Sequence, residues 1–358
     1  MVDKQHLAEK LLSQTIKKKC LIGFDGFTDE ILAVVKTRID GDHFTPMDQM
    51  QDLATLIKRH AKKSCNIELI QKTTKIGGNA AILTNALLEG GHAITFIGTI
   101  GTKDKIEPLF LPMAKRCDSV IPLGPSAHSD ALEFDDGKVI LGKLNALKHL
   151  NYDTVIQIVG YENLKNLLDE SVLLVTVNWT MLPWITTFWE KLKTDFKLAS
   201  KKRSLFVDLA DPAKRTKDSL KQALNALSAL EGLYAVTLGL NESEALCLGH
   251  LFSIKASMRD LGHQLQKILN LKEIIIHEAK KAHGFTKEEC VSIDTPFTKH
   301  PAIMTGAGDH FNAGFCNGKL FGFTLEECLC LGGTTSSYYV RFGKTPTRTE
   351  IADFLKHN

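Results

Sequence analysis

The chain of 358 residues is predicted to adopt an α/β fold, with a mostly parallel central sheet covered by helices and a small second sheet attached to it. Three observations support this prediction. Short β-branched runs alternate along the chain with amphipathic helical stretches, which is the usual order of elements in such folds. The runs are apolar almost throughout, as strands buried on both faces have to be. Three further stretches alternate apolar residues with lysine and threonine, which indicates a sheet exposed to water on one side.

The central sheet is predicted from seven apolar runs. Helices fit between these runs, for example over 217–230 and 257–270, where apolar residues recur at helical spacing. The predicted strands are residues 20–24, 93–98, 154–160, 171–177, 204–209, 235–240 and 273–278.

The small sheet is predicted from residues 29–41, 66–76 and 131–144. In the last of these stretches, Asp136-Gly137 is a strong signal for a two-residue hairpin turn. The intervening stretch 45–63 is predicted to be a helix. One face of that helix carries Leu53, Leu56 and Ile57. Because no linker or repeat separates these parts, we expect one domain over residues 1–358 with a small β appendage.

The composition argues against several classes of protein. Apolar residues make up 44% and charged residues 24%, and the net charge is only +3, so neither nucleic acid nor a membrane is an expected partner. The start of the chain lacks the apolar core of a signal peptide, and the longest apolar runs are shorter than the roughly 20 residues of a membrane span. The eight cysteines show no CxxC spacing, which favours free thiols in a reducing cytoplasm over disulfides or a zinc site.

The stretch "MTGAGDHFNAGF" (304–315) places glycines and an acid at the start of a predicted helix. The first amides of a helix have no acceptor within it and carry the positive end of its dipole, so they attract anions. Gly306 and Gly308 would let an anion approach that backbone closely. Asp309 would lie beside the anion and could accept a proton from an attacking hydroxyl group. The structural alternative is a glycine-rich helix cap without a ligand.

Two other stretches can be read in two ways. Asn241 and Glu244 in "LGLNESEALCLG" (238–249) have the spacing of a capping box, and their oxygens could alternatively hold Mg²⁺ and its waters at the end of a strand. In "KIGGNAA" (75–81), the glycine pair could admit a ligand or simply form a tight strand-to-helix turn. The residues concerned are Gly77, Gly78 and Asn79.

Asp25 and Asp29 lie just beyond the first predicted strand. Acids at this end of a parallel strand suit hydrogen bonding to ligand hydroxyl groups, although exposed aspartates in turns are common. Several known motifs are absent. The chain has no P-loop, its "HEAKKAH" (277–283) has the wrong histidine spacing for a zinc protease, and it has no GxSxG elbow. Phe311 replaces the third glycine of a dinucleotide fingerprint, which argues against a dehydrogenase.

Taken together and in this order, these stretches resemble the PfkB carbohydrate kinase (ribokinase-like) family over about residues 20–347. The glycine–aspartate motif is the most specific part, and "GGN", "NESE" and "DPAKR" (211–215) add to it. The resemblance implies a three-layer sandwich with a small β-sheet lid, and ATP-dependent phosphorylation of a hydroxyl group. The implied lid is formed by about 27–44, 66–76 and 130–144, with a helical insertion at about 45–63.

The resemblance also implies roles for single residues. Asp309 would be the general base, and Asn241 and Glu244 would support Mg²⁺ through its waters. The anion hole would be formed by the amides of Gly306, Ala307 and Gly308. The acceptor would bind at Asp25, Asp29, Gly77, Gly78 and Asn79. The nucleotide would contact Asn241, His277, Lys280, Thr305, Gly306 and Gly308. Because such lids often pair between subunits, a homodimer is also expected.

The chain departs from the family pattern at several positions. Ile303 replaces an aspartate that helps to hold a monovalent cation in many members, which puts potassium activation in doubt. Ile82 replaces a frequent substrate-binding asparagine, so the sugar is not identified. Ala279 stands where the nucleotide loop usually has a glycine.

The sequence therefore predicts a cytoplasmic kinase that uses ATP and Mg²⁺ to phosphorylate a sugar or sugar-like small molecule. One alternative is a nucleoside kinase of the same fold, which would need an aromatic platform near the lid. The candidates for such a platform are Phe27, Phe44 and Phe134. The other alternative is a catalytically silent binding protein of this fold, and the presence of Asp309 and both glycines argues against it.

Overall fold

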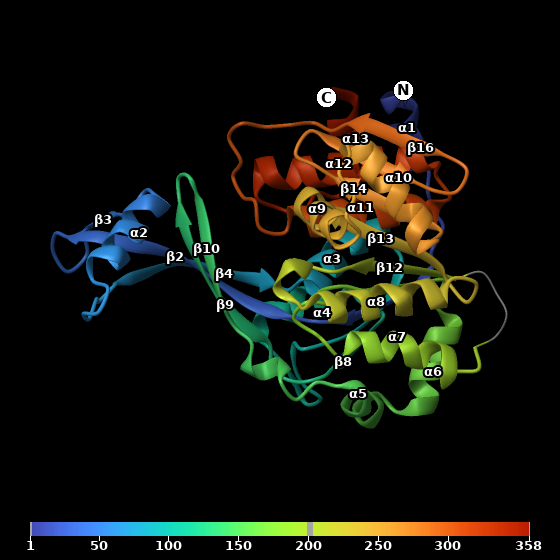
Figure 1. Cartoon of the computed structure of the whole chain (residues 1–358), viewed down its shortest axis with the longest axis horizontal. Coiled ribbons are helices and arrows are strands. Elements are labelled where there is room, and N and C mark those ends of the chain that lie inside the picture. Colours follow the sequence, from blue (N-terminus) through green and yellow to red (C-terminus); the bar gives the residue numbers. More distant parts are fainter. Residues whose placement is uncertain (1, 199–202, 358) are drawn as a thin grey trace.

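The computed structural model describes residues 2–198 and 203–357, which form a three-layer α/β sandwich (Figure 1). Within these residues, the central sheet has nine strands in the order β16-β15-β14-β13-β12-β11-β1-β5-β8. The strands from β14 to β8 in that order are parallel, and β15 and β16 add antiparallel pairs at one edge. The strands are β1 (Lys19–Phe24), β5 (Ala93–Gly98), β8 (Ser119–Pro122), β11 (Leu173–Thr176), β12 (Ser204–Asp208), β13 (Ala235–Asn241), β14 (Glu273–His277), β15 (Lys281–Phe285) and β16 (Cys290–Asp294).

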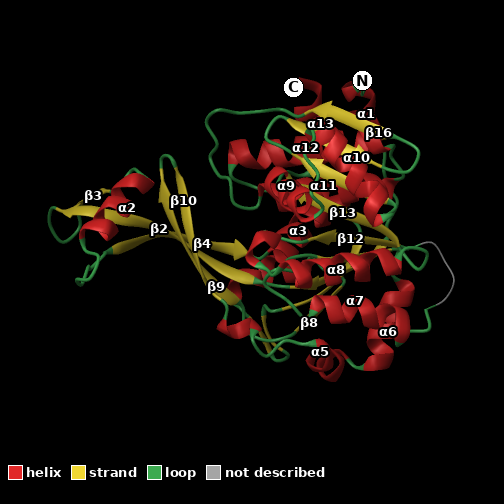
Figure 2. Cartoon of the chain, in the orientation of Figure 1, coloured by secondary structure: helices red, strands yellow, loops and turns green. Residues whose placement is uncertain are grey.

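Helices cover both faces of this sheet (Figure 2). Strand side chains alternate between the faces, so Leu205 and Val207 pack under one helical layer and Phe206 packs under the other. The first layer contains α5 (Tyr152–Val159), α6 (Tyr161–Glu170), α7 (Ile185–Thr194), α8 (Lys217–Leu230), α9 (Glu242–Leu251) and α10 (Met258–Leu269). The second contains α1 (Lys4–Leu12), α3 (Asn79–Leu87), α4 (Leu111–Ala114), α11 (Ala307–Phe321), α12 (Leu325–Phe342) and α13 (Arg348–His357). Short elements between them are β6 (Gly101–Thr102), β7 (Lys105–Ile106), η1 (Leu88–Gly90), η2 (Pro108–Phe110), η3 (Asn145–Leu147) and η4 (Pro212–Lys214).

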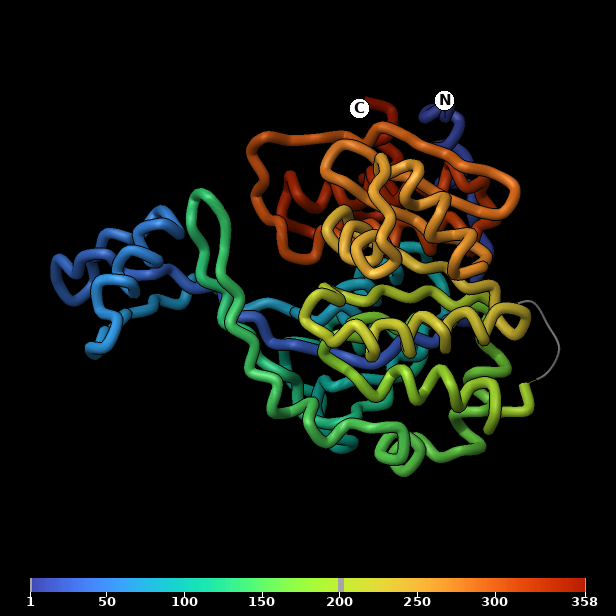
Figure 3. The backbone as a smooth tube through the Cα atoms, in the orientation of Figure 1, coloured from blue at the N-terminus to red at the C-terminus, as the bar shows by residue number. Residues whose placement is uncertain are grey.

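A small sheet projects from the body of the molecule (Figure 3). It consists of β2 (Phe27–Arg38), β3 (Phe44–Pro46), β4 (Leu69–Gly77), β9 (Ala127–Phe134) and β10 (Gly137–Lys143). The long strand β2 pairs with β9 in parallel and with β4 in antiparallel orientation. Helix α2 (Met50–Arg59) packs on one face of this sheet. The apolar contacts there are made by Leu32, Val34, Met47, Leu53 and Leu132.

The opposite face of the small sheet, called the polar face here, carries a group of polar side chains next to the buried Ile31 and Ala131. Asp29 on β2 is in register with Ser129 on β9 and with Lys75 on β4. On the neighbouring hairpin, Lys138 of β10 is in register with Glu133 of β9. Because paired residues point to the same face and Ser129 and Glu133 are separated by an even number of residues, these five side chains share one face.

Six of the seven predicted strands of the central sheet are confirmed, and the prediction for 154–160 is wrong. That stretch belongs to α5, where burial of Val155 and Val159 follows a helical rather than a strand period. Asn151 caps the helix by accepting a hydrogen bond of 2.9 Å from the amide of Thr154. The strands β8, β15 and β16 were not predicted.

Two predictions for the small sheet need correction. The predicted helix over 45–63 is shorter, because Phe44–Pro46 forms β3 and α2 covers only Met50–Arg59. Of its predicted apolar face, Leu53 is buried, whereas Ile57 is 54% exposed. The predicted hairpin is present, but its turn lies one residue earlier, since Gly137 already pairs with Phe134 as the first residue of β10.

The remaining predictions about the whole chain concern membranes and thiols. Among the described residues, no helix combines the length and apolarity that crossing a bilayer requires. The eight cysteines are all free thiols, as predicted, and Cys65 is the exposed one among them.

Candidate active site

Polar residues gather where the parallel strands end. Asp25 follows β1, Asp208 ends β12, and Asn241 ends β13. Strand β1 lies between β5 and β11. The chain reaches β5 through α3 on one face of the sheet, and it reaches β11 through α5 and α6 on the other face. Sheets of this kind bind ligands outside the carboxyl ends of the strands at such a switch point. Helices α3 and α11 begin at the same end, with Asn79 and Asp309 in their first turns.

Asp309 is a buried carboxylate at the start of α11. Its Oδ1 accepts a hydrogen bond of 3.0 Å from Nδ2 of Asn79. Burial, followed by the nearby carboxylates of Asp208 and Asp25, raises the pKa of Asp309 well above its usual range. Negative charges thus surround Asp309, which favours a proton or an added cation there.

Hydrogen bonds from His310 and Tyr339 hold the turn before α11 in place. Gly306 has φ +91, a left-handed conformation that favours glycine, and it caps the helix without a side chain. Its carbonyl oxygen accepts hydrogen bonds from the amide of His310 at 3.0 Å and from Nδ1 of the same residue at 2.7 Å. The hydroxyl of Tyr339 donates to the carbonyl oxygen of Thr305 at 2.9 Å. These contacts fix the backbone of the turn, and the neighbouring Met304, Ala307 and Gly308 line a cavity.

The three predicted anion-hole amides are not equivalent. The amide of Ala307 donates to the carbonyl oxygen of Met304 at 3.2 Å, so it is already used in this conformation. Among the described residues, the amide of Gly308 has no acceptor, as expected for the first turn of a helix. A methyl group on Gly308 would lie 3.5 Å from Cε1 of His277, which is an ordinary contact. No contact among the described residues therefore requires glycine at 308, whereas a ligand approaching the backbone would.

The glycine pair of the GGN stretch accommodates two aspartates. A side chain on Gly77 would collide with the carboxylate of Asp29, and one on Gly78, at φ +86, would lie 2.9 Å from Oδ2 of Asp25. The carboxylate of Asp25 is fully buried and accepts from the amides of Asn79 and Ala80, both at 2.9 Å.

Asp25 therefore caps α3. It also accepts a hydrogen bond of 2.8 Å from Nδ2 of Asn178, and burial raises its pKa to about 6. These partners favour a structural role for Asp25 over the predicted contact with a substrate hydroxyl group.

Asp29 lies on the polar face of the small sheet. Its carboxylate is buried and accepts a hydrogen bond from Oγ of Ser129. Burial raises the pKa of Asp29, and the positive charges of Lys75 and Lys138 partly offset that effect. Asp29 belongs to β2 of the small sheet, whereas Asp25 lies between β1 and β2.

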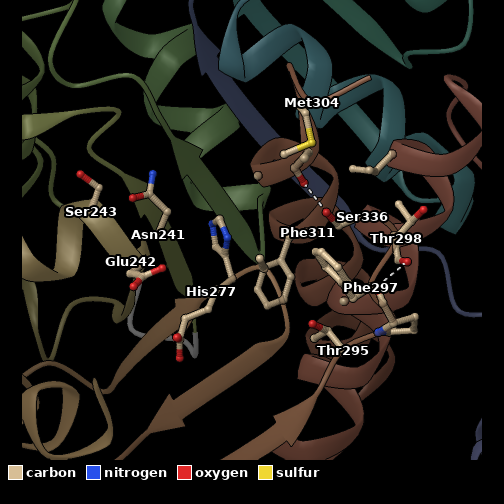
Figure 4. Close-up of a pocket in the computed structure, with 18 residues that line it drawn as sticks. Asn241, Glu242, Ser243, His277, Thr295, Phe297, Thr298, Met304, Phe311 and Ser336 are labelled. Carbon is tan, nitrogen blue, oxygen red and sulfur yellow. Dashed lines mark hydrogen bonds between the residues drawn. The ribbon is translucent and has the colours of Figure 1, made fainter. Parts of the chain in front are cut away.

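A cavity of about 410 Å³ lies beside the start of α11 (Figure 4). His277 and Phe311 stand next to each other in it, with ring centroids 4.8 Å apart. Burial lowers the pKa of His277 to about 4, so its imidazole is neutral near pH 7. Lys280 is exposed, and its Nζ lies 4.9 Å from the ring centroid of Phe297, which lines the cavity. Other lining residues are Asn241, Ser243, Thr295, Gly308 and Ser336.

The capping box predicted at the end of β13 is present. Oδ1 of Asn241 accepts from the amide of Glu244, and Oε2 of Glu244 accepts from the amide of Asn241, both at 2.9 Å. The other oxygen of Glu244 accepts from the amide of Asp211 at 3.0 Å. Burial and the charge of Asp208 raise the pKa of Glu244 to about 8. The carboxylate is thus used for capping, and no ion pair forms with it in the part of the chain that the structure describes.

Sequence reasoning missed Asp208, Asn178 and Lys138. Asp208 accepts a hydrogen bond of 2.8 Å from Nδ2 of Asn312 and contributes to the raised pKa of Asp309. Its position near the end of the predicted strand 204–209 was a usable signal, because Asp25 drew attention for lying just beyond the end of the predicted strand 20–24. Nothing local in the sequence marks Asn178 or Lys138, since their partners Asp25 and Thr305 are 153 and 167 residues away.

Comparison with known proteins adds an independent finding. A family model described as prokaryotic ketohexokinase matches residues 4–358. A ketohexokinase from Haloferax volcanii is 26% identical over 343 residues, which cover 94% of this chain and 90% of that protein.

Solved structures with the ribokinase fold superpose on nearly the whole chain. A ribokinase from Thermotoga maritima gives a TM-score of 0.67 at 19% identity, covering 95% of this chain and all of that one. A nucleoside kinase of the ribokinase family from Methanocaldococcus jannaschii gives 0.61 at 14% identity, covering 96% of this chain and all of that one. At these identities the likeness establishes the ribokinase-like fold, as the sequence predicted.

Proposed function

The chain belongs to the prokaryotic ketohexokinase family and is a ribokinase-like carbohydrate kinase, and we propose that it transfers the γ-phosphate of ATP to a hydroxyl group of a ketohexose. One observation carries the proposed chemistry. Asp309, a buried acid with a raised pKa, directly follows Gly308, which lines the cavity beside α11, and the charge of Asp29 on the small sheet also acts on it. A base at that place can reach an alcohol on one side while a phosphate enters from the other.

We propose that Asp309 is the general base. Its raised pKa makes it a stronger base than an exposed aspartate, and Asn79 orients its Oδ1. A positioned base contributes about 10²–10⁴-fold to a rate. During transfer, the acceptor oxygen bonds to the γ-phosphorus, its proton passes to Asp309, and the bond to the bridging oxygen of ADP breaks.

The start of α11 is proposed to stabilise the charge on the phosphoryl group. The amide of Gly308 is available, and the helix dipole favours negative charge at this end. The amide of Ala307 would join only if its bond to Met304 opened. The nucleotide is proposed to occupy the cavity lined by Asn241, His277 and Phe297, with Lys280 at its exposed side.

Mg²⁺ fits two acids, Asp208 and Glu244, that form no ion pair with any described residue. Asp208 and Glu244 are buried and mutually repulsive, and burial raises the pKa of each. Because their oxygens already accept protein hydrogen bonds, these residues would hold the ion through its waters, with Asn241 beside them. When bound, the ion supplies neutralisation of the phosphate charge.

The small sheet is proposed to act as the lid over the acceptor. It carries Asp29, whose charge acts on Asp309, and Lys138, which contacts Thr305 before α11, and closure would exclude the water that wastes ATP. The three aromatic residues that could have formed a nucleoside platform pack against other parts of the protein. Phe27 belongs to the main core, Phe134 packs in the α2 cluster, and Phe44 lies under Arg38 at 5.7 Å. A sugar is therefore favoured over a nucleoside.

The test is an ATP-consumption assay with Mg²⁺ and a panel of ketohexoses, aldoses and nucleosides, with the product identified by mass. We expect a ketohexose to give a phosphorylated product at the highest kcat/KM. Phosphorylation of a nucleoside instead would overturn the proposed acceptor, and ATP binding without transfer to any of these acceptors would overturn the proposed kinase activity.

A further inference from the structure

Lys138 connects the small sheet to the turn before α11. It is the second residue of β10, and its Nζ donates a hydrogen bond to Oγ1 of Thr305. Thr305 directly precedes Gly306, the N-cap of α11. Register places Lys138 on the same face of the small sheet as Asp29. A cation from this sheet therefore reaches the edge of the proposed anion hole.

The charge of Lys138 is incompletely compensated within the protein. Among the described residues, no carboxylate lies within 4.0 Å of its Nζ, whereas Lys36, Lys72 and Lys143 of the small sheet each have one. Asp29 and Glu133 attract Lys138 from farther away, and Lys75 repels it. Burial is the main reason that the pKa of Lys138 lies below its usual range.

The present partner of Lys138 is a neutral oxygen. An ammonium group has three donors and prefers an anionic acceptor to a hydroxyl group. The acids near Lys138 are Asp29 and Glu133, on the face of the small sheet that is proposed to bind the acceptor. The hydroxyl of Thr305 lies next to the start of α11, which is proposed to bind the phosphate. An incoming phosphate at the start of α11 would give this half-buried cation the anion that it lacks.

We propose that Lys138 is a catalytic residue that the small sheet brings to the transferring phosphoryl group, exchanging the hydroxyl of Thr305 for a phosphate oxygen. This inference rests on the proposed kinase function. Lys138 keeps its proton throughout: the acceptor oxygen bonds to the γ-phosphorus, the acceptor proton goes to Asp309, and ADP leaves. Its role is to stabilise the charge on the phosphoryl oxygens and on the departing bridging oxygen.

Because Asp29 and Lys138 share one face of one sheet, acceptor binding and phosphate contact would be coupled. A sugar held by Asp29 would fix the sheet in the position that places Lys138 on the phosphate. Without a sugar, the lysine would remain on Thr305 and ATP would hydrolyse slowly.

The test compares Lys138→Met, Lys138→Arg and a matched control, Lys143→Met. Lys143 lies on the same strand but on the opposite face, where it pairs with Asp130 at 2.8 Å. We expect Lys138→Met to lower kcat about 100-fold, as does the loss of one oxyanion donor in other enzymes. The kcat of Lys138→Arg should be at least tenfold higher than that of Lys138→Met. The kcat of Lys143→Met should stay within twofold of the parent value.

Calorimetry separates a phosphate contact from a structural role. With sugar present, Lys138→Met should weaken binding of a non-hydrolysable ATP analogue at least tenfold and binding of ADP less than twofold. Equal losses for both nucleotides, or a kcat within threefold of the parent, would overturn the inference. Asp309→Asn, measured in parallel, distinguishes failure of the inference about Lys138 from failure of the proposed kinase mechanism. An inactive Asp309→Asn beside a fully active Lys138→Met refutes only the role of Lys138. An active Asp309→Asn refutes the proposed mechanism.

Discussion

At the scale of single residues, the two positions that flank Ala307 differ in whether the backbone conformation requires a glycine. Gly306 needs glycine because its φ is +91, whereas Gly308 has helical backbone and room for a methyl group. Gly306→Ala should therefore destabilise the fold by about 1 kcal/mol or more. Gly308→Ala should leave the melting temperature unchanged or slightly higher, because alanine favours the helix.

The activities of these two variants test the proposed phosphate approach. In Gly308→Ala, the methyl group would stand in the way of the phosphate, so kcat/KM for ATP should fall at least about tenfold. Thermal melts and steady-state kinetics measure the two effects. A Gly308→Ala enzyme with parental kinetics would show that no ligand approaches this backbone.

A second residue-scale prediction concerns the pH dependence of stability. The folded-state pKa of Asp309 is raised above the ordinary value of about 3.9. Its ionisation therefore opposes folding, and stability is lost as the pH rises from about 4 through the folded-state pKa. Asp309→Asn lacks this loss, so its melting temperature should exceed that of the parent by at least about 2 °C at pH 8 and by less at pH 5. Equal melting curves at both pH values would contradict the buried, uncompensated charge.

At the scale of elements, helix α2 supports the small sheet. Leu53 is buried against β2 and β9, whereas Ile57 on the same helix is largely exposed. Leu53→Ala should lower the local stability of the small sheet by about 2–5 kcal/mol. Because the sheet that carries Asp29 would then be less well ordered, the KM for the sugar should rise. Hydrogen exchange should speed up in β2 and β9 and stay unchanged in β12 and β13. Ile57→Ala is the matched control, and a similar effect of both variants would refute this role for α2.

The elements that sequence reasoning found are those with an unambiguous period. Buried strands such as 204–209 and amphipathic helices such as 217–230 were located within a residue or two. The stretch 154–160 was misassigned because a short apolar run fits a strand and a helix equally well. The hairpin after Phe134 was recognised by its Asp-Gly signal, but the turn is formed by Asp135 and Asp136, since Gly137 already pairs with Phe134.

The site was predictable where its chemistry is local and not where it depends on distant contacts. The glycine–aspartate turn and the capping box were visible as short motifs. The capping role of Asp25 was not, since it depends on the start of α3 and on Asn178. The same holds for Lys138, whose partner comes from the far end of the chain.

At the scale of the whole molecule, the predicted homodimer through the small sheet can be tested directly. Helix α2 covers much of one face, but Ile140 and Leu141 of β10 are about half exposed and point to opposite faces. If the sheets pair, burial of these side chains would contribute, and Ile140→Lys or Leu141→Lys should shift a dimer toward monomer at least tenfold in dissociation constant. Light scattering across micromolar concentrations measures this shift. A parent protein that is monomeric throughout that range would rule out the dimer.

The central claim is that Asp309 takes the proton of the acceptor while the start of α11 holds the phosphate. The most direct measurement is the turnover of Asp309→Asn with saturating ATP, Mg²⁺ and the ketohexose, alongside calorimetric binding of ATP. We predict a kcat at least 100-fold below that of the parent, with the affinity for ATP retained within a few fold. A variant that binds ATP and still phosphorylates the sugar at the parental rate would contradict the claim.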